Sequence, residues 1–172
     1  MNKIIFLLLS VITLSCQPTE NRTTNVVTSD IDNFWNAYDL ILKETDSIKK
    51  IRLIDSLYIQ KGTVGLEKIM DARGYSAEEY VQLISNYPKY FSSLRQNTMK
   101  SKQLANELKQ GIEKLEAVYP YLKPAKIYFT MGCMRSNGTT VDSLVLIGSE
   151  LAMVDKQTDI SEFRGETKKW LK

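Results

Sequence analysis

The 172-residue sequence contains no histidine. This absence removes the commonest general base and the commonest protein ligand of zinc. Catalytic triads of the Ser-His-Asp kind, Cys-His pairs and histidine-containing zinc sites are therefore excluded within this chain. Cysteine is scarce, with only Cys16 and Cys133 present. If Cys16 is modified, as argued below, one thiol remains and no disulfide can form within the chain.

Strongly basic segments are also missing. The formal net charge is +3 and 25% of the residues are charged, but lysine and arginine form no arm or stripe. We therefore expect no nucleic-acid partner. The hydrophobic fraction of 43% is ordinary for a globular protein, and the length suffices for one domain with its own core.

The sequence begins with the pattern of a secretory signal. Lys3 carries a positive charge, residues 4–14 are mostly apolar, and the small Ser15 stands directly before Cys16. The apolar stretch is shorter than the roughly 20 residues that a membrane-spanning helix needs. The letters TLSC resemble the lipobox of bacterial lipoproteins, with Thr13 where leucine is commonest. The resemblance implies lipid transfer to the sulfur of Cys16, cleavage before it and acylation of the new amine.

Several acyl chains at Cys16 would make a firm anchor, because each buried methylene adds about 0.8 kcal/mol of membrane affinity. The lipid bilayer is then the expected partner, and the cell envelope the expected location. Gln17 is not the aspartate associated with inner-membrane retention, so the resemblance favours the outer membrane of a Gram-negative bacterium. The alternative is a plain signal peptide in which Cys16 is an ordinary residue. We interpret residues 1–15 as signal peptide, 16–29 as a flexible polar tether and 30–172 as one domain.

Hydrophobic periodicity predicts a helical domain with strands near its C-terminus. Apolar residues recur every three or four positions, which predicts helices over 30–42, 46–61, 64–72, 77–87 and 90–117, and another from about Ser161. Residues 125–131 alternate and 143–148 are apolar, as in two strands that pair as a hairpin. The predicted fold class is α+β, mostly helical, with a small antiparallel sheet or hairpin. Two strands alone are marginal and no helix stop follows Trp170, so we expect an incomplete part of a larger design.

Few side chains of the domain are candidates for chemistry. Glu150 closely follows the second predicted strand, so it is a candidate for lining a cleft. Cys133 lies in a predicted loop without a histidine base, which favours a small, semi-buried thiol over a nucleophile. Glu79 is explained by capping of the helix that follows Ser76. Phe34, Trp35 and Tyr38 are interpreted as core residues.

The segment from Val118 to Leu151 resembles a known family. It carries VYPYLKPAKIYFTMG, then SNGTT, then LVLIGSEL. On these residues it is similar to bacterial lipoproteins related to gliding-motility lipoprotein B and to predicted zinc-dependent, zincin-like proteases. In zincin-like members such strands precede a helix with His-Glu-x-x-His, which binds zinc and supplies the base. This chain lacks that motif, so no catalytic, cofactor-binding or metal-binding residue carries over.

The resemblance implies a helical front half and the sheet strands of a protease-like domain. In zincins an edge strand aligns extended substrate, a role for which Tyr128, Thr130 or Val145 are the candidates here. Tyr128, Thr130 and Glu150 together are the candidate cleft. The expected function is a non-catalytic, lipid-anchored lipoprotein with a truncated or degenerate protease-like domain that binds an extended peptide or an envelope protein. The alternatives are the N-terminal part of a zinc-dependent peptidase, with zinc bound only by a downstream segment, and a structural or binding module of the envelope.

Overall fold

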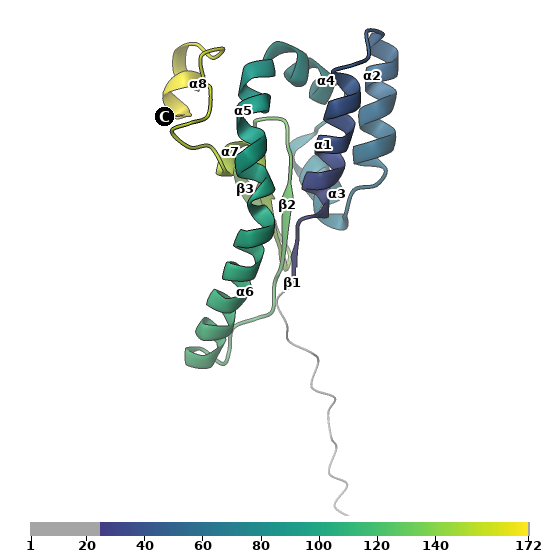
Figure 1. Cartoon of the computed structure of the whole chain (residues 1–172). Coiled ribbons are helices and arrows are strands. Elements are labelled where there is room, and N and C mark those ends of the chain that lie inside the picture. The colour runs from purple at the N-terminus through teal and green to yellow at the C-terminus, as the bar shows by residue number, and fades with distance from the viewer. Residues whose placement is uncertain (1–24, 172) are drawn as a thin grey trace, which may run out of the picture.

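The computed structural model describes residues 25–171, which fold around a four-stranded mixed sheet (Figure 1). The strand order is β1-β2-β4-β3. Strands β1, β2 and β4 are parallel to one another, and β3 runs antiparallel to β4. The strands are β1 (Asn25–Val27), β2 (Lys126–Thr130), β3 (Gly138–Val141) and β4 (Leu144–Gly148).

The predicted α+β class with a helical majority is confirmed, but the hairpin between the two predicted strands is wrong. Those strands, β2 and β4, pair in parallel, with Lys126 opposite Leu144 and Thr130 opposite Gly148. The reason is the unexpected strand β3, which a two-residue turn joins to β4. Asp142 in that turn has a φ of 52°. Because β3 reverses the chain once more, β4 runs in the same direction as β2.

The prediction of a flexible tether over 16–29 is wrong for its last five residues, 25–29. Asn25–Val27 pairs with β2 and Ser29 begins the first helix. Val26 is buried, so an adjacent pair of β-branched residues supplies an edge strand where the polar neighbours indicated a linker. The rest of the tether, the signal peptide and Cys16 lie outside the described residues.

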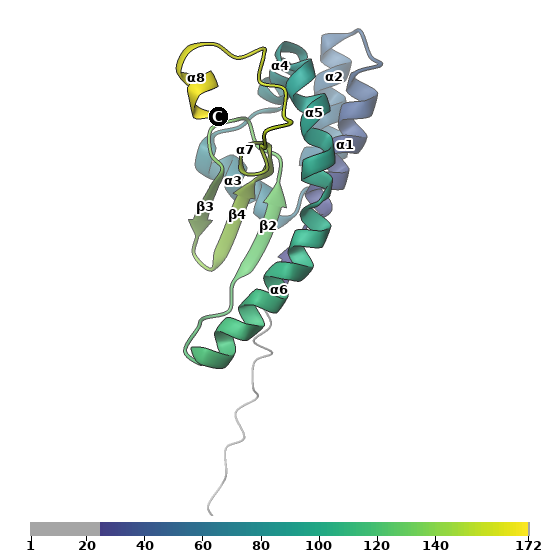
Figure 2. The ribbon, with the colours of Figure 1, turned by 60° about the vertical axis from the view of Figure 1, so that its left-hand side comes forward.

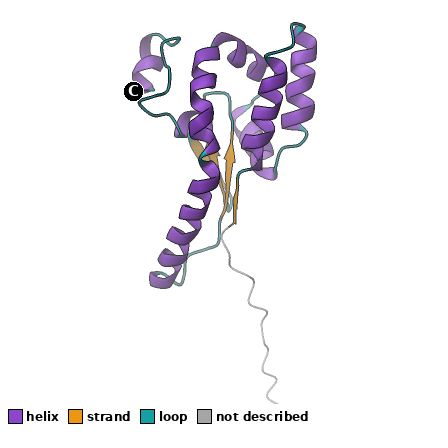
Figure 3. Cartoon of the chain, in the orientation of Figure 1, coloured by secondary structure: helices purple, strands orange, loops and turns teal. Residues whose placement is uncertain are grey.

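The predicted helices of the first half are present (Figure 3). Asp46, Thr63 and Ser76 accept backbone hydrogen bonds as N-caps, and the left-handed Gly74 ends α3. The second predicted helix continues from α2 into a π-helical turn, η1. These elements are α1 (Ser29–Ile41), α2 (Ser47–Ile54), η1 (Asp55–Ile59), α3 (Val64–Arg73) and α4 (Ala77–Asn86).

The long helix predicted over 90–117 is two helices, α5 (Pro88–Met99) and α6 (Ser101–Val118). The break is at Lys100, whose backbone N–H donates to the Asn97 oxygen three residues earlier at 2.9 Å. Such a tightened turn leaves the hydrophobic pattern almost in phase, which explains why periodicity alone predicted one helix. Two short helices follow the sheet, α7 (Ser149–Ala152) and α8 (Gly165–Trp170).

The core lies where the helices meet the sheet. Helices α1 and α3 pack against β2, and α6 packs against β1 (Figures 1 and 2). Phe34, Trp35 and Tyr38 are buried, as predicted. Trp35 Nε1 donates to Thr98 Oγ1 at 2.9 Å and so joins α1 to α5. Within residues 25–171, none of the helices has the length and apolar character to cross a bilayer.

Candidate functional site

The candidate site lies at the C-terminal ends of the parallel strands β2 and β4. Open parallel sheets bind ligands at the carboxyl ends of their strands. The loop 131–136 follows β2 there, and α7 follows β4. We call this group the Glu150 centre: Glu150, the loop 131–136, and the tyrosines at positions 58, 75, 80 and 90. Its polar groups are mostly buried and hold one another in place.

Glu150 is fully buried and its carboxylate accepts hydrogen bonds from the loop. Oε2 accepts from the Gly132 N–H at 2.7 Å, and Oε1 accepts from the Met134 N–H at 3.1 Å. Burial raises the pKa of this carboxyl to about 7, although the backbone donors oppose the shift. The Tyr90 hydroxyl donates to the Glu150 carbonyl oxygen. Glu150 thus ties α7 to the loop that follows β2.

Two buried tyrosines hold the first residue of the loop. Tyr58 Oη donates to the Met131 oxygen at 2.6 Å and accepts from the Met131 N–H at 2.9 Å. Tyr80 Oη donates to the same oxygen at 2.8 Å. The two rings meet edge to face with centroids 5.4 Å apart, and burial raises both tyrosine pKa values well above their ordinary range. Both backbone polar groups of Met131 are therefore satisfied by side chains from η1 and α4.

Arg135 fastens the far side of the loop to α3 and α4. Its Nη1 donates to the Arg73 oxygen at 2.5 Å and to the Gly74 oxygen at 3.1 Å. Its Nη2 pairs with the Glu79 carboxylate. The Ser76 hydroxyl caps α4 as expected, accepting from the Glu79 N–H at 3.3 Å, but the Glu79 side chain serves this long-range pair. Sequence spacing carried no signal for that contact, because 56 positions separate the partners.

Cys133 is 3% exposed, so its thiol is more deeply buried than the predicted semi-buried position. Desolvation raises its pKa, and the carboxylates of Glu79 and Glu150 add to the effect. A thiol held in its neutral form is a poor nucleophile. The neighbouring Tyr75 hydroxyl is buried and has no hydrogen-bond partner among the described residues.

The three residues of the predicted cleft are buried within the packed domain. Thr130 is buried and its hydroxyl donates to the Ile147 oxygen at 3.0 Å, bridging β2 and β4. Tyr128 is also buried, and its ring lies against Gly65 of α3. Among the described residues, Glu150 forms no hydrogen bond with Tyr128 or with Thr130. The structure therefore places all three inside the packed domain, not along an open surface.

The edge-strand role expected for Tyr128, Thr130 or Val145 is wrong. Tyr128 and Thr130 lie on β2 and Val145 lies on β4, and these are the two inner strands. Each has a neighbouring strand on both sides, so neither is the edge of the sheet to which an extended peptide would add. Among the described residues the sheet edges are β1 and β3.

A hollow lies between α8 and the segment 154–160, and Glu150 is not among the residues that line it. It has a volume of about 800 Å³ and includes Asn137, Asp155, Lys156 and the exposed Trp170 in its wall. Over residues 25–171 no three His, Cys, Asp or Glu side chains are grouped so that they could hold a metal ion.

Phenylalanine at position 58 should destabilise the loop without changing the shape of the core. Tyr58→Phe removes both hydrogen bonds to Met131 and leaves its buried N–H unpaired, so we expect a loss of about 2 kcal/mol in the free energy of unfolding. Tyr80→Phe should lose about 1 kcal/mol, because the shared oxygen keeps its bond from Tyr58. Urea denaturation measures both, with the exposed Tyr119→Phe as control. Equal stability of the Tyr58 variant and the control would contradict this assignment.

The arrangement can hold a proton at Glu150 near neutral pH and can fix the backbone of the loop, but the carboxylate has no exposed surface at which to meet a substrate. We therefore interpret the Glu150 centre as a structural element that holds the loop 131–136 in place. It lies at the carboxyl ends of parallel strands, where open parallel sheets in general bind ligands. The chain matches no protein-family model, no curated protein and no solved structure.

Proposed function

We propose that this chain is a bacterial envelope lipoprotein, anchored by lipid at Cys16, whose folded domain acts by binding and not by catalysis. The observation that carries the proposal is the secretory pattern of residues 1–15 followed directly by Cys16. Gln17 after the cysteine favours the outer membrane. The anchor makes the lipid bilayer the first partner, and an extended peptide or another envelope protein is the second.

The domain supports this proposal through the character of its polar groups. The chain has no histidine, Cys133 is a buried neutral thiol, and Glu150 is engaged with the backbone of a loop. These side chains serve the architecture of the domain, which leaves its surface as the part that can meet partners.

Replacement of Cys16 should release the protein from the membrane. In a Gram-negative host, the wild type is expected in the membrane fraction, with a mature N-terminus at Cys16 that carries the mass of a diacylglyceryl group and an amide-linked acyl chain. Cys16→Ser should lose that mass and fall at least about tenfold in the detergent phase, because acyl chains supply the membrane affinity.

Cys133→Ala is the matched control for this experiment, since it removes the other thiol and leaves the lipobox intact. It should retain the lipid mass and the membrane fraction. Wild-type protein with an unmodified Cys16, or with cleavage at another residue, would refute the anchoring proposal.

A protease-like role is the second candidate, and the free edge of the sheet is the observation that favours it. Within the described residues β3 pairs only with β4, and Thr140 is exposed. An extended peptide could add to that edge, as in strand addition. Amide signals of Gly138–Val141 that shift with an extended peptide would support this role, as would a His-Glu-x-x-His segment in the DNA downstream. Without either result the candidate fails.

A further inference from the structure

Three exposed apolar side chains gather where α6 ends, and we call them the tyrosine tip: Val118, Tyr119 and Tyr121. Their exposed fractions are 79%, 52% and 83%. The two tyrosine rings meet edge to face with centroids 6.3 Å apart. Because the burial of hydrophobic groups is favourable, such a cluster indicates a surface that contacts another molecule. Its position in the fold indicates which molecule that is.

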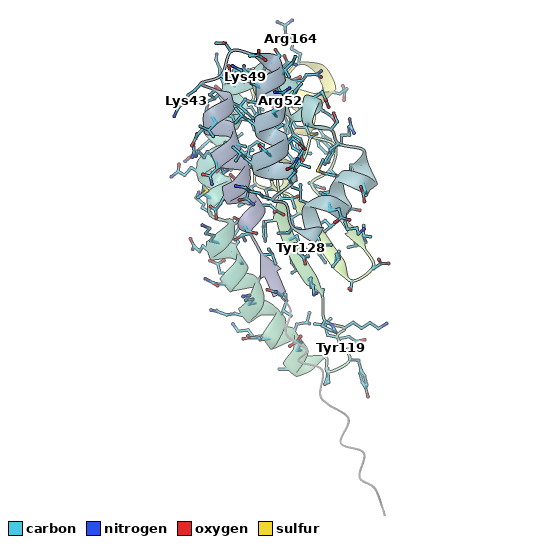
Figure 4. All side chains as sticks on the ribbon, turned by 90° about the vertical axis from the view of Figure 1, so that its right-hand side faces the viewer. Lys43, Lys49, Arg52, Tyr119, Tyr128 and Arg164 are labelled. Atoms are coloured by element: carbon cyan, nitrogen blue, oxygen red, sulfur yellow. The ribbon has the colours of Figure 1, made fainter. Side chains whose placement is uncertain are left out.

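The tyrosine tip lies at the end of the domain where β1 begins. Asn25 is the register partner of Lys126, which follows Tyr121 by five positions. The C-terminal part of α6 extends past the sheet toward this end (Figures 1 and 2). Figure 4 shows Tyr119 there, far from Lys43, Lys49 and Arg52 at the opposite end of the molecule.

The lipid anchor brings this end of the domain close to the membrane. Cys16 precedes Asn25 by nine residues, and even a fully extended chain of that length spans at most about 32 Å. With its acyl chains in the bilayer, Cys16 therefore keeps the first residue of β1 within that distance of the headgroups. The tyrosine tip lies at that same end of the domain (Figures 1 and 4).

The chemistry of the tip suits the boundary between lipid and water. Tyrosine is enriched there, because its ring is apolar and its hydroxyl stays hydrated. Lys114, Lys123 and Lys126 are exposed nearby and can extend their ammonium groups toward headgroups. Glu113 and Glu116 on the last turns of α6 offset most of this charge. The contact would therefore depend on the aromatic and aliphatic side chains more than on anionic lipid.

We infer that the tyrosine tip inserts into the headgroup region of the leaflet that holds Cys16. The acyl chains and the tip then form two points of contact, which orient the domain with α2 and the loop at Lys43 away from the bilayer. This inference rests on the proposed lipid anchor. It adds a membrane-binding surface of the folded domain, which lipidation by itself does not require.

Lipid quenching of a tryptophan at the tip tests the inference in the mature, lipidated protein. Tyr121→Trp is made together with Trp170→Phe, which removes the exposed native tryptophan and leaves the buried Trp35 as background. The protein is reconstituted in vesicles of phosphatidylethanolamine and phosphatidylglycerol brominated near the headgroup. The control carries Ile48→Trp in the same background, because Ile48 is 62% exposed near Lys49 at the opposite end.

We expect quenching at position 121 to exceed that at position 48 by at least about twofold, because bromine quenches only on close contact. Adding Tyr119→Ser should lower the quenching at position 121 while leaving the fold intact, since this side chain is exposed. Equal quenching at both positions in a protein shown by mass to be lipidated would overturn the inference and leave the anchor in place. An unmodified Cys16 would overturn the anchor and the inference together.

Discussion

Glutamine at position 150 is expected to remove about 3 kcal/mol of pH dependence from the free energy of unfolding. Burial raises the pKa of Glu150 from 4.5 to about 7 in the folded protein. Each unit by which the pKa differs between the folded and unfolded states changes the free energy of unfolding by about 1.4 kcal/mol. Because the carboxyl is fully buried, solvent does not screen this effect.

The sign of the effect follows from proton binding. Between pH 4.5 and 7 the folded protein holds a proton at Glu150 that the unfolded chain releases. The contribution to stability is therefore complete below pH 4.5, and it is lost as the pH rises through about 7. Wild-type protein should become less stable over this interval, whereas Glu150→Gln should lack that part of the slope.

Urea denaturation across pH 4.5 to 8, performed on both proteins, measures the difference directly, and carbon NMR of the Glu150 carboxyl reports its titration. Asp30 also has a raised pKa from burial, so the slope that remains in the variant includes its effect. At acid pH the variant should be less stable than the wild type by about 1–3 kcal/mol, since an amide cannot accept both loop N–H bonds. Parallel pH profiles for the two proteins would show that Glu150 titrates normally, and the described centre would be wrong.

Alanine at position 65 should cost about 3 kcal/mol of stability. A Cβ added to Gly65 would lie 2.2 Å from Cγ and 2.4 Å from Cβ of Tyr128. The Tyr128 Cβ is fixed to β2, so the clash is not relieved by rotating the ring. The helix propensity gained from alanine is only about 1 kcal/mol, and the steric strain of overpacking outweighs it. Urea or thermal denaturation of Gly65→Ala is the measurement.

Gly111→Ala is the matched control, because a Cβ at this position of α6 meets nothing within 4 Å. Here the propensity gain stands alone, and we expect stabilisation by about 0.5–1 kcal/mol. The two substitutions should therefore have opposite signs. A neutral or stabilising Gly65→Ala would mean that α3 does not pack as closely on β2 as described.

Local signals in the sequence predicted most of the helices, since their apolar stripes and caps involve residues three or four positions apart. Asp46, Thr63 and Ser76 each act at the helix start that their spacing indicates. Two local effects were missed. The break at Lys100 hardly disturbs the hydrophobic period, and the strand at Val26 has only three residues, too short for alternation to be visible.

Sequence alone determined the signal pattern at Cys16, the α+β class and the chemical exclusions that follow from the absence of histidine. Those features depend on composition and on neighbours along the chain. Tertiary structure decided the parallel pairing of β2 with β4, the burial of Glu150 against Gly132, and the meeting of Arg135 with Glu79. It also placed the C-terminal end of α6, which carries the tyrosine tip, at the end of the domain where β1 begins. These contacts join residues far apart in sequence, and the direction of a strand or the burial of a carboxyl is settled only when the whole core packs.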